Sequence, residues 1–417
     1  MAFHGRIIDQ LGLQTYQSPS AALAELVANS WDANANIVKI FLPEQLDENA
    51  EIVISDDGDG RIFEECEEKY LKIGYDRRKG KAVELTSKGR HILGRKGIGK
   101  FAGFGIASII RVETISRSTG EKTTFEMKLD ELKSDKYIAE GGKLSAEYLG
   151  PSYTRKKENG TKITLKKLTF VRNISKTQLP RSLARRFLLH HLTDDFKIFV
   201  DGKPLPISED TSKIQYVFPR DYVKSEKPDD LQIDGDWGEE TLSNGRKIQW
   251  RVFFFRDTID EEELQGITIF SHGKLAQRPF LFNLTGGLGG QLGQSYMSGQ
   301  VQADFVDELD VDPMATERQR INFELEETLP LLTWGQEKVK KMLILWKKRR
   351  SESTISPLEK RIPIFSKRIN ELPTSEASTI TSVLKRIASV SSLTEKQFDE
   401  LAKAVLTAWE DIVKRKK

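Results

Sequence analysis

Three polar side chains, Glu25, Asn29 and Asp32, occupy positions i, i+4 and i+7 of a segment rich in alanine and leucine. In an α-helix this spacing places all three side chains on one face. Ser18 followed by Pro19 predicts where the helix begins, because serine caps helix N-termini and proline is favoured at the first helical position. A carboxylate and an amide aligned in this way can orient a water molecule and a hard cation such as Mg²⁺. If the helix stood alone, a solvated helix face would show the same pattern.

Two predicted strands and an aspartate-glycine turn follow this helix. Residues 36–42 and 51–55 are rich in isoleucine and valine, which favours strands, and the second runs into Asp56-Asp57-Gly58-Asp59-Gly60. Glycines allow the backbone to turn tightly there while the first carboxylate, Asp56, faces a pocket. Farther along, Asn159-Gly160-Thr161 predicts a second turn that leads into a strand over residues 161–165.

A glycine-rich loop, Gly94-Arg95-Lys96-Gly97-Ile98-Gly99-Lys100, precedes the apolar segment 101–110. Such a loop can direct backbone N–H groups, and the N-terminus of a following helix, at phosphates. It also matches most of a P-loop pattern, but Phe101 stands where that pattern needs a serine or threonine for Mg²⁺. The preceding residues 88–93 are also a poor candidate for a buried strand, so the P-loop interpretation is rejected.

Four segments follow one another along the chain: the helix with Glu25, the turn after Asp56, the glycine-rich loop and the turn at Asn159. In this order they resemble the ATP-binding domain of the GHKL superfamily, which includes gyrase B, the ninety-kilodalton heat-shock chaperones, histidine kinases, MutL and the MORC ATPases. The resemblance covers residues 15–170 and implies an α+β protein. We expect a Bergerat-type ATP-binding α/β sandwich over residues 1–167, a transducer-like α+β domain over 168–322 and a helical C-terminal region over 323–417.

The resemblance also implies roles for individual residues. Glu25 is expected to act as the general base on the attacking water, Asn29 to hold Mg²⁺, Asp32 to give polar support, and Asp56 to accept the amino group of adenine. The other nucleotide-binding positions implied are Gly58, Gly60, Lys96, Gly97, Gly99, Lys100 and Thr161.

A cation from the transducer-like domain is expected to contact the γ-phosphate, and two residues are candidates. Lys274 lies in a turn after the predicted strand 266–270, as in the MutL and MORC arrangement. Arg318 lies in a segment that resembles the arginine-bearing segment of the heat-shock chaperones. Either could equally be a surface cation, and Lys274 is slightly favoured.

Composition sets limits on the class of protein. The 417 residues are 38% hydrophobic and 30% charged, which is ordinary for a globular chain of two or three domains. A net charge of +3 gives no bulk electrostatic argument for nucleic-acid binding. The single cysteine, Cys66, excludes an intramolecular disulfide, and no apolar stretch approaches the ~18 residues of a membrane span. These features predict a cytoplasmic protein.

Four segments have more than one interpretation. Residues 1–17 could be a packed N-terminal helix or a strap that reaches a second protomer, and residues 74–93 could be a solvated loop or a lid over the nucleotide. Gly286-Gly287-Leu288-Gly289-Gly290 is read as a flexible loop rather than a phosphate loop. The basic ends of the C-terminal helices fit helix packing or dimerisation better than nucleic-acid contact.

The predicted function is ATP binding and slow, Mg²⁺-dependent hydrolysis, with ATP-dependent closure of a homodimer that acts on DNA or a client protein. The layout is closest to MORC-like and chaperone-like ATPases, which suggests DNA maintenance or phage defence as the context. A non-enzymatic ATP-binding regulatory or scaffold module is the alternative. A histidine kinase is disfavoured, because the ATP motif begins near the N-terminus and leaves no room for preceding phosphoacceptor helices.

Overall fold

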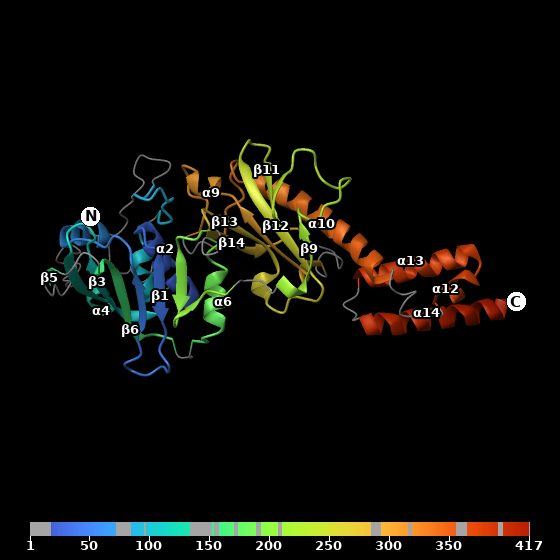
Figure 1. Ribbon diagram of the computed structural model, residues 1–417, viewed down its shortest axis with the longest axis horizontal. Helices are drawn as coiled ribbons and strands as arrows, with labels where there is room; N and C mark the ends of the chain where they lie inside the picture. The colour runs from blue at the N-terminus through green and yellow to red at the C-terminus, as the bar shows by residue number, and fades with distance from the viewer. Residues whose placement is uncertain are drawn as a thin grey trace. The chain divides into compact units, whose positions relative to one another are not determined.

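The computed structural model describes most of the chain, and it is mixed α/β with two sheets and a helical C-terminal region, as predicted (Figure 1). The described residues are 18–71, 85–95, 97–133, 152–153, 158–170, 174–188, 193–206, 211–284, 293–315, 319–355, 365–390 and 395–416. Predictions for residues 1–17, most of the 74–93 segment, Lys96, the glycines at 286–290 and Arg318 lie outside these ranges.

Two compact units make up the chain, and neither is continuous in sequence. The first comprises residues 1–210, 269–278 and 302–325, and the second comprises 211–268, 279–301 and 326–417. Part of the segment expected to be the transducer-like domain is therefore included in the first unit.

Helix α2 (Pro19–Asp32) begins where its capping signals predicted. Ser18 has extended backbone dihedrals, and its Oγ accepts the backbone N–H of Ala21 at 3.2 Å. The helix ends before Asn34, which adopts the left-handed conformation with φ of +60°. That conformation is tolerated best by glycine, asparagine and aspartate, so Asn34 is a suitable stop.

The sheet of the first unit has eight strands in the order β5-β4-β3-β6-β2-β1-β7-β8. Their bounds are β1 (Ile37–Phe41), β2 (Ile52–Asp56), β3 (Ala107–Ile115), β4 (Glu121–Lys128), β5 (Ser152–Tyr153), β6 (Gly160–Leu168), β7 (Lys197–Val200) and β8 (Lys203–Pro204). Strand β7 pairs in parallel with β1, so this sheet continues beyond residue 167, the expected domain boundary. Asp201 and Gly202 both have positive φ and form the predicted hairpin turn between β7 and β8.

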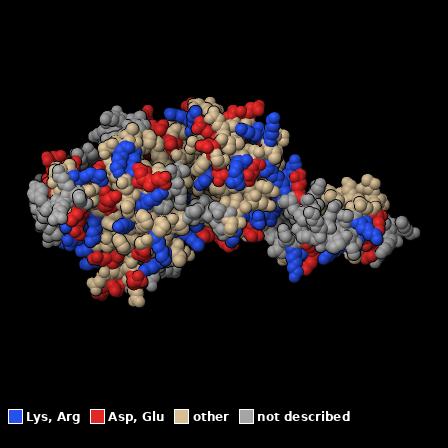
Figure 2. Space-filling view, viewed as in Figure 1, with Lys and Arg blue, Asp and Glu red and all other residues tan. Residues whose placement is uncertain are grey.

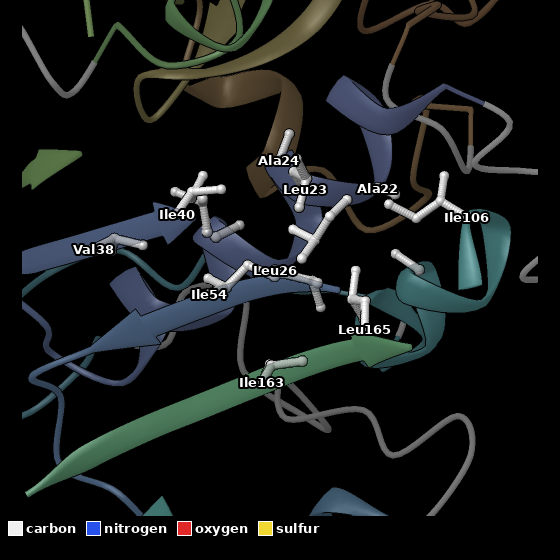
Figure 3. Close-up of a cluster of buried hydrophobic side chains, with 14 of the residues drawn as sticks. Ala22, Leu23, Ala24, Leu26, Val38, Ile40, Ile54, Ile106, Ile163 and Leu165 are labelled. Atoms are coloured by element: carbon white, nitrogen blue, oxygen red, sulfur yellow. The ribbon is translucent and has the colours of Figure 1, made fainter. Parts of the chain in front are cut away.

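Helix α2 packs on one face of this sheet (Figure 3). Leu23 and Leu26 on the helix face Ile40, Ile54 and Leu165 on the central strands, and all five side chains are buried. Burial of each such side chain stabilises the fold by about 1.5–3 kcal/mol. The helix that carries the predicted catalytic face is therefore fixed to the sheet by its opposite face.

The glycine-rich loop is not followed by an α-helix. A 3₁₀ helix, η3 (Gly99–Gly105), follows it, and β3 begins at Ala107. Glycine at positions 99, 103 and 105 disfavours an α-helix here. Any phosphate contact from this loop consequently relies on local backbone N–H groups.

The second sheet contains seven strands in the order β10-β11-β12-β15-β13-β14, with β9 paired to β12. The strands are β9 (Ile214–Phe218), β10 (Gln232–Asp234), β11 (Trp237–Thr241), β12 (Lys247–Phe255), β13 (Gly266–Ser271), β14 (Lys274–Phe280) and β15 (Met297–Gln302). The predicted strands at 249–255 and 266–270 are therefore confirmed.

Helices α10 (Leu329–Ile355), α12 (Phe365–Asn370), α13 (Thr374–Val390) and α14 (Glu395–Lys416) occupy the C-terminal region. Ile380, Leu384, Phe398 and Leu406 form a separate apolar cluster there. Within the described part of the chain, no helix combines the length and the apolar character that crossing a bilayer requires.

Candidate functional site

Asp56 lies at the end of β2, where three elements of the first unit meet. Its Oδ1 accepts the backbone N–H groups of Gly58 at 2.9 Å and Thr161 at 3.1 Å, and its Oδ2 accepts the hydroxyl of Ser30 at 2.8 Å. Burial raises the pKa of the Asp56 carboxyl, and the three donors together with the charge of Arg61 oppose that rise. The carboxyl is thus held in one orientation, and Oδ2 keeps lone-pair capacity for a further donor.

The glycines around Asp56 are required by close backbone approach. A Cβ on Gly58 would lie 2.9 Å from Asp56 Oδ1, and a Cβ on Gly160 would lie 1.9 Å from the Asp56 carbonyl oxygen. Gly60 has φ of +64°, and a Cβ there would lie 1.9 Å from the carbonyl oxygen of Ile115. The predicted turn therefore closes tightly on the carboxylate only because these positions have no side chain.

Two hydroxyl residues near Asp56 were missed in the sequence. Ser30 donates to Asp56, and the Thr114 hydroxyl lies 3.1 Å from the Thr161 hydroxyl. Thr161 pairs directly with Asp56 in the β2–β6 register, and Thr114 pairs with Thr161 in the β3–β6 register. Ser30 follows Leu26 by one turn, on the side of the helix that faces the sheet, so helix periodicity could have indicated it. Thr114 could be identified only from the register of strands β3 and β6.

The predicted catalytic face of α2 approaches a residue from a distant segment. Lys274 Nζ lies 2.9 Å from Glu25 Oε1, and the two side chains are 4% and 13% exposed. Both residues belong to the first unit, because residues 269–278 are part of it. The loop also lies close to Glu25, since a Cβ on Gly99 would stand 2.9 Å from Glu25 Oε2.

Asp32 holds the start of the glycine-rich loop. Its Oδ1 accepts the backbone N–H of Leu93 at 2.7 Å, and its Oδ2 accepts that of Gly94 at 3.0 Å. A Cβ on Gly94 would lie 2.9 Å from Asp32 Oδ2, so this contact depends on glycine. Asp32 therefore positions the loop, and the polar support expected of it toward a nucleotide stays a prediction.

Asn29 lies between Glu25 and Asp32 on the helix. Among the described residues, its Nδ2 is buried without a hydrogen-bond partner. A buried amide of this kind costs free energy unless another group completes its hydrogen bonds. The Asn29 side-chain N–H groups are therefore available to donate a hydrogen bond to a ligand.

The remaining loop residues have different surroundings. Gly97 has φ of +65°, a conformation that favours glycine. Lys100 is buried in η3, with its Nζ 5.9 Å from the centre of the Tyr70 ring. The guanidinium of Arg95 donates to the carbonyl oxygens of Leu309 at 2.6 Å and Asp310 at 3.0 Å, so it ties the loop to that segment of the first unit.

Comparison with known proteins adds to this geometry. Residues 16–161 match the family model described as Histidine kinase-, DNA gyrase B-, and HSP90-like ATPase. A protein of Herpetosiphon aurantiacus named "Putative type II restriction enzyme HgiDII" is 28% identical over 376 residues, which are 87% of this chain and 58% of that protein. The chain thus spans less than two thirds of this relative's length. The family match covers the helix, the aspartate-glycine turn, the loop and Thr161, and residues 16–161 therefore carry a GHKL-type ATPase domain, which supports ATP binding.

Proposed function

We propose that this protein hydrolyses ATP slowly with Mg²⁺, and that nucleotide binding controls closure of a homodimer. The observation that carries this proposal is the arrangement along α2. Ser30 orients the Asp56 carboxyl, and Glu25, five residues earlier, lies beside Lys274. At 1.5 Å per residue, these two ends of the site are roughly 7.5 Å apart along the helix axis.

The residues present fit both ATP and Mg²⁺. Asp56 Oδ2 has the capacity to accept the amino group of adenine, and the buried Asn29 amide has an N–H group that lacks a partner among the described residues. No group of three or more His, Cys, Asp or Glu residues in the described ranges is arranged to hold a metal ion. Mg²⁺ commonly keeps several waters and binds through few protein ligands plus phosphates, so Asn29 Oδ1 is sufficient as its protein ligand.

When bound, ATP supplies the phosphoanhydride bond, and Mg²⁺ neutralises part of its charge. Glu25 orients a water molecule and removes its proton, a role that requires only hydrogen-bond reach. Lys274, held 2.9 Å from Glu25, supplies the positive charge that stabilises negative charge developing on the transferred phosphoryl group. Asp32 fixes the first residues of the loop that covers the phosphates.

We propose DNA, or a protein bound to DNA, as the target of the closed dimer. The support is the printed name of the Herpetosiphon relative, "Putative type II restriction enzyme HgiDII", and a related role here would be defence against foreign DNA. Acidic and basic side chains are interspersed on the face shown in Figure 2, and the net charge is only +3, so any DNA contact must be local.

The test measures the molecular mass of the protein in solution and its rate of ATP hydrolysis. Sedimentation of wild type and Glu25→Ala is measured with and without Mg²⁺ and a non-hydrolysable ATP analogue, and phosphate release is measured in parallel. We expect nucleotide-dependent dimers for both proteins, with turnover in wild type alone. Equal loss of nucleotide affinity and turnover in Glu25→Ala would refute its role as the base. Dimerisation without any wild-type turnover would favour a non-enzymatic ATP-binding module.

A further inference from the structure

The turn that carries Lys274 is held by several contacts within the first unit. His272 and Gly273 form the turn between β13 and β14, with φ values of +48° and +72°. The backbone N–H of His272 donates to Asp304 Oδ1 at 2.6 Å, and the N–H of Leu188 donates to the Gly273 carbonyl at 2.8 Å. Lys274 itself forms a β-bridge with Phe187. The position of the Lys274 ammonium therefore depends on how this turn is held.

The His272 ring also stacks on the His91 ring. Their centroids are 4.0 Å apart, and the ring planes differ by 13°. His91 is held by helix α2, because its carbonyl oxygen accepts the indole N–H of Trp31 at 2.9 Å. His91 also lies three residues before Gly94, where the glycine-rich loop begins. The stack thus joins the Lys274 turn directly to the helix and loop of the ATP site.

Two stacked imidazoles respond to protons in a way that two phenyl rings do not. Burial lowers the pKa of His272, and a charge on His91 would lower it further. Three acids act in the other direction and raise the pKa of His272: Asp304 at 3.6 Å from Nδ1, Glu308 at 3.9 Å from Nε2, and Asp307. On the His91 side, the nearest cation by sequence is Arg90, whose guanidinium is bonded to Asp195 at 2.8 Å. Burial outweighs these acids, so the His272 ring is held neutral, and a proton on it would place a charge in the buried stack, 4.0 Å from the His91 ring.

We propose that the His91–His272 stack is a positioning element for Lys274, which keeps the ammonium beside Glu25 while the His272 ring is neutral. This inference rests on the proposed function, because it assumes that Lys274 contacts the γ-phosphate. It adds a pair of residues that sets the position of that cation and makes it depend on pH.

The first test is a double-mutant cycle that does not require hydrolysis. The affinities of a non-hydrolysable ATP analogue and of ADP are measured for wild type, His272→Ala, Lys274→Ala and the double variant. We expect His272→Ala to lower the preference for the ATP analogue over ADP roughly three- to tenfold, the size of an aromatic pair interaction. ADP affinity should not change, and His272→Ala should add nothing in the Lys274→Ala background. An equal loss in both backgrounds would show a merely structural role and overturn the proposal.

The second test separates stacking from charge. His272→Phe keeps a flat ring in the same place and cannot be protonated, so it also serves if His272→Ala fails to fold. We expect this variant to keep the wild-type preference for the ATP analogue at neutral pH. It should lose the decline that wild type shows in acid, which burial of His272 moves below the ordinary histidine pKa of about 6.5. A wild-type decline that persists in His272→Phe would refute the proton dependence. If Lys274→Ala leaves the preference for the ATP analogue over ADP unchanged, the proposed function is refuted, and this inference with it. If Lys274→Ala lowers the preference and His272→Ala does not, only this inference is refuted.

Discussion

Asp56→Asn gives the sharpest test of the base pocket, because the structure predicts the orientation of the new amide. Oδ1 accepts two backbone N–H groups, from Gly58 and Thr161, so the asparagine oxygen must take that place. The amide nitrogen then takes the place of Oδ2, where it can donate to Ser30 Oγ. The turn around residue 56 stays folded, but a donor replaces the acceptor that we propose for the adenine amino group.

The expected loss of affinity follows from one hydrogen bond to a charged acceptor. Such a bond contributes about 1.5–3 kcal/mol, which corresponds to a roughly 10- to 150-fold weaker ATP affinity. Titration calorimetry with ATP and with inosine triphosphate, which carries a carbonyl in place of the amino group, measures this change. We expect Asp56→Asn to lose its preference for ATP over inosine triphosphate.

Asp57→Asn is the matched control. Asp57 Oδ1 accepts the backbone N–H groups of Asn36 at 2.7 Å and Ile37 at 2.8 Å, so its carboxylate is occupied away from Asp56. This variant should bind ATP as wild type does. Unchanged ATP affinity in Asp56→Asn, or an equal loss in Asp57→Asn, would refute the assignment of the adenine contact to Asp56.

The same substitution has a consequence for stability without nucleotide. Burial raises the pKa of Asp56 above its usual 3.8, so the folded state favours the protonated carboxyl. The stability that this preference contributes is present below pH 3.8 and is lost as the pH rises through the raised folded-state pKa. Asp56→Asn is neutral at every pH, and we expect it to raise the Tm at neutral pH, with a smaller gain in acid. A lower Tm at neutral pH would contradict this.

Three further predictions concern other parts of the chain. Asn29→Ala should weaken ATP binding in Mg²⁺ and not in EDTA, and a normal response to Mg²⁺ would indicate another ligand. Lys338→Met should destabilise the second unit by about 3–5 kcal/mol in urea unfolding, because it leaves Glu240, bonded to Lys338 at 2.6 Å, as a buried unpaired charge. Adding Glu240→Gln should recover much of that loss, and a single variant as stable as wild type would refute the argument. Burial raises the pKa of Cys66 to about 11, so maleimide should label it slowly at neutral pH until urea unfolds the chain; equally fast labelling without urea would contradict this.

Local patterns were the parts of this protein that could be predicted from the sequence. The spacing of Glu25, Asn29 and Asp32 defines one helical face, and Ser18 with Pro19 marks where the helix starts. The turn after Asp56 could be predicted for the same reason, since glycine and aspartate act on backbone conformation within a few residues.

Contacts between distant segments could not be predicted in this way. The alternation of apolar and polar residues along a strand does not show which other strand it pairs with. Neither the pairing of β7 with β1 nor the Thr114–Thr161 contact was therefore predicted. The helix expected after the glycine-rich loop is instead a 3₁₀ helix, because three glycines weaken the α-helical alternative.

The amino-acid sequence by itself determined the polar face of α2, the start of that helix and the turn after Asp56, because helix periodicity, capping and glycine turns act over a few residues. Only the tertiary structure decided that Lys274 lies beside Glu25 and that His272 stacks on His91. Those contacts join segments far apart in the chain, and they depend on how the whole first unit packs around α2 and its sheet.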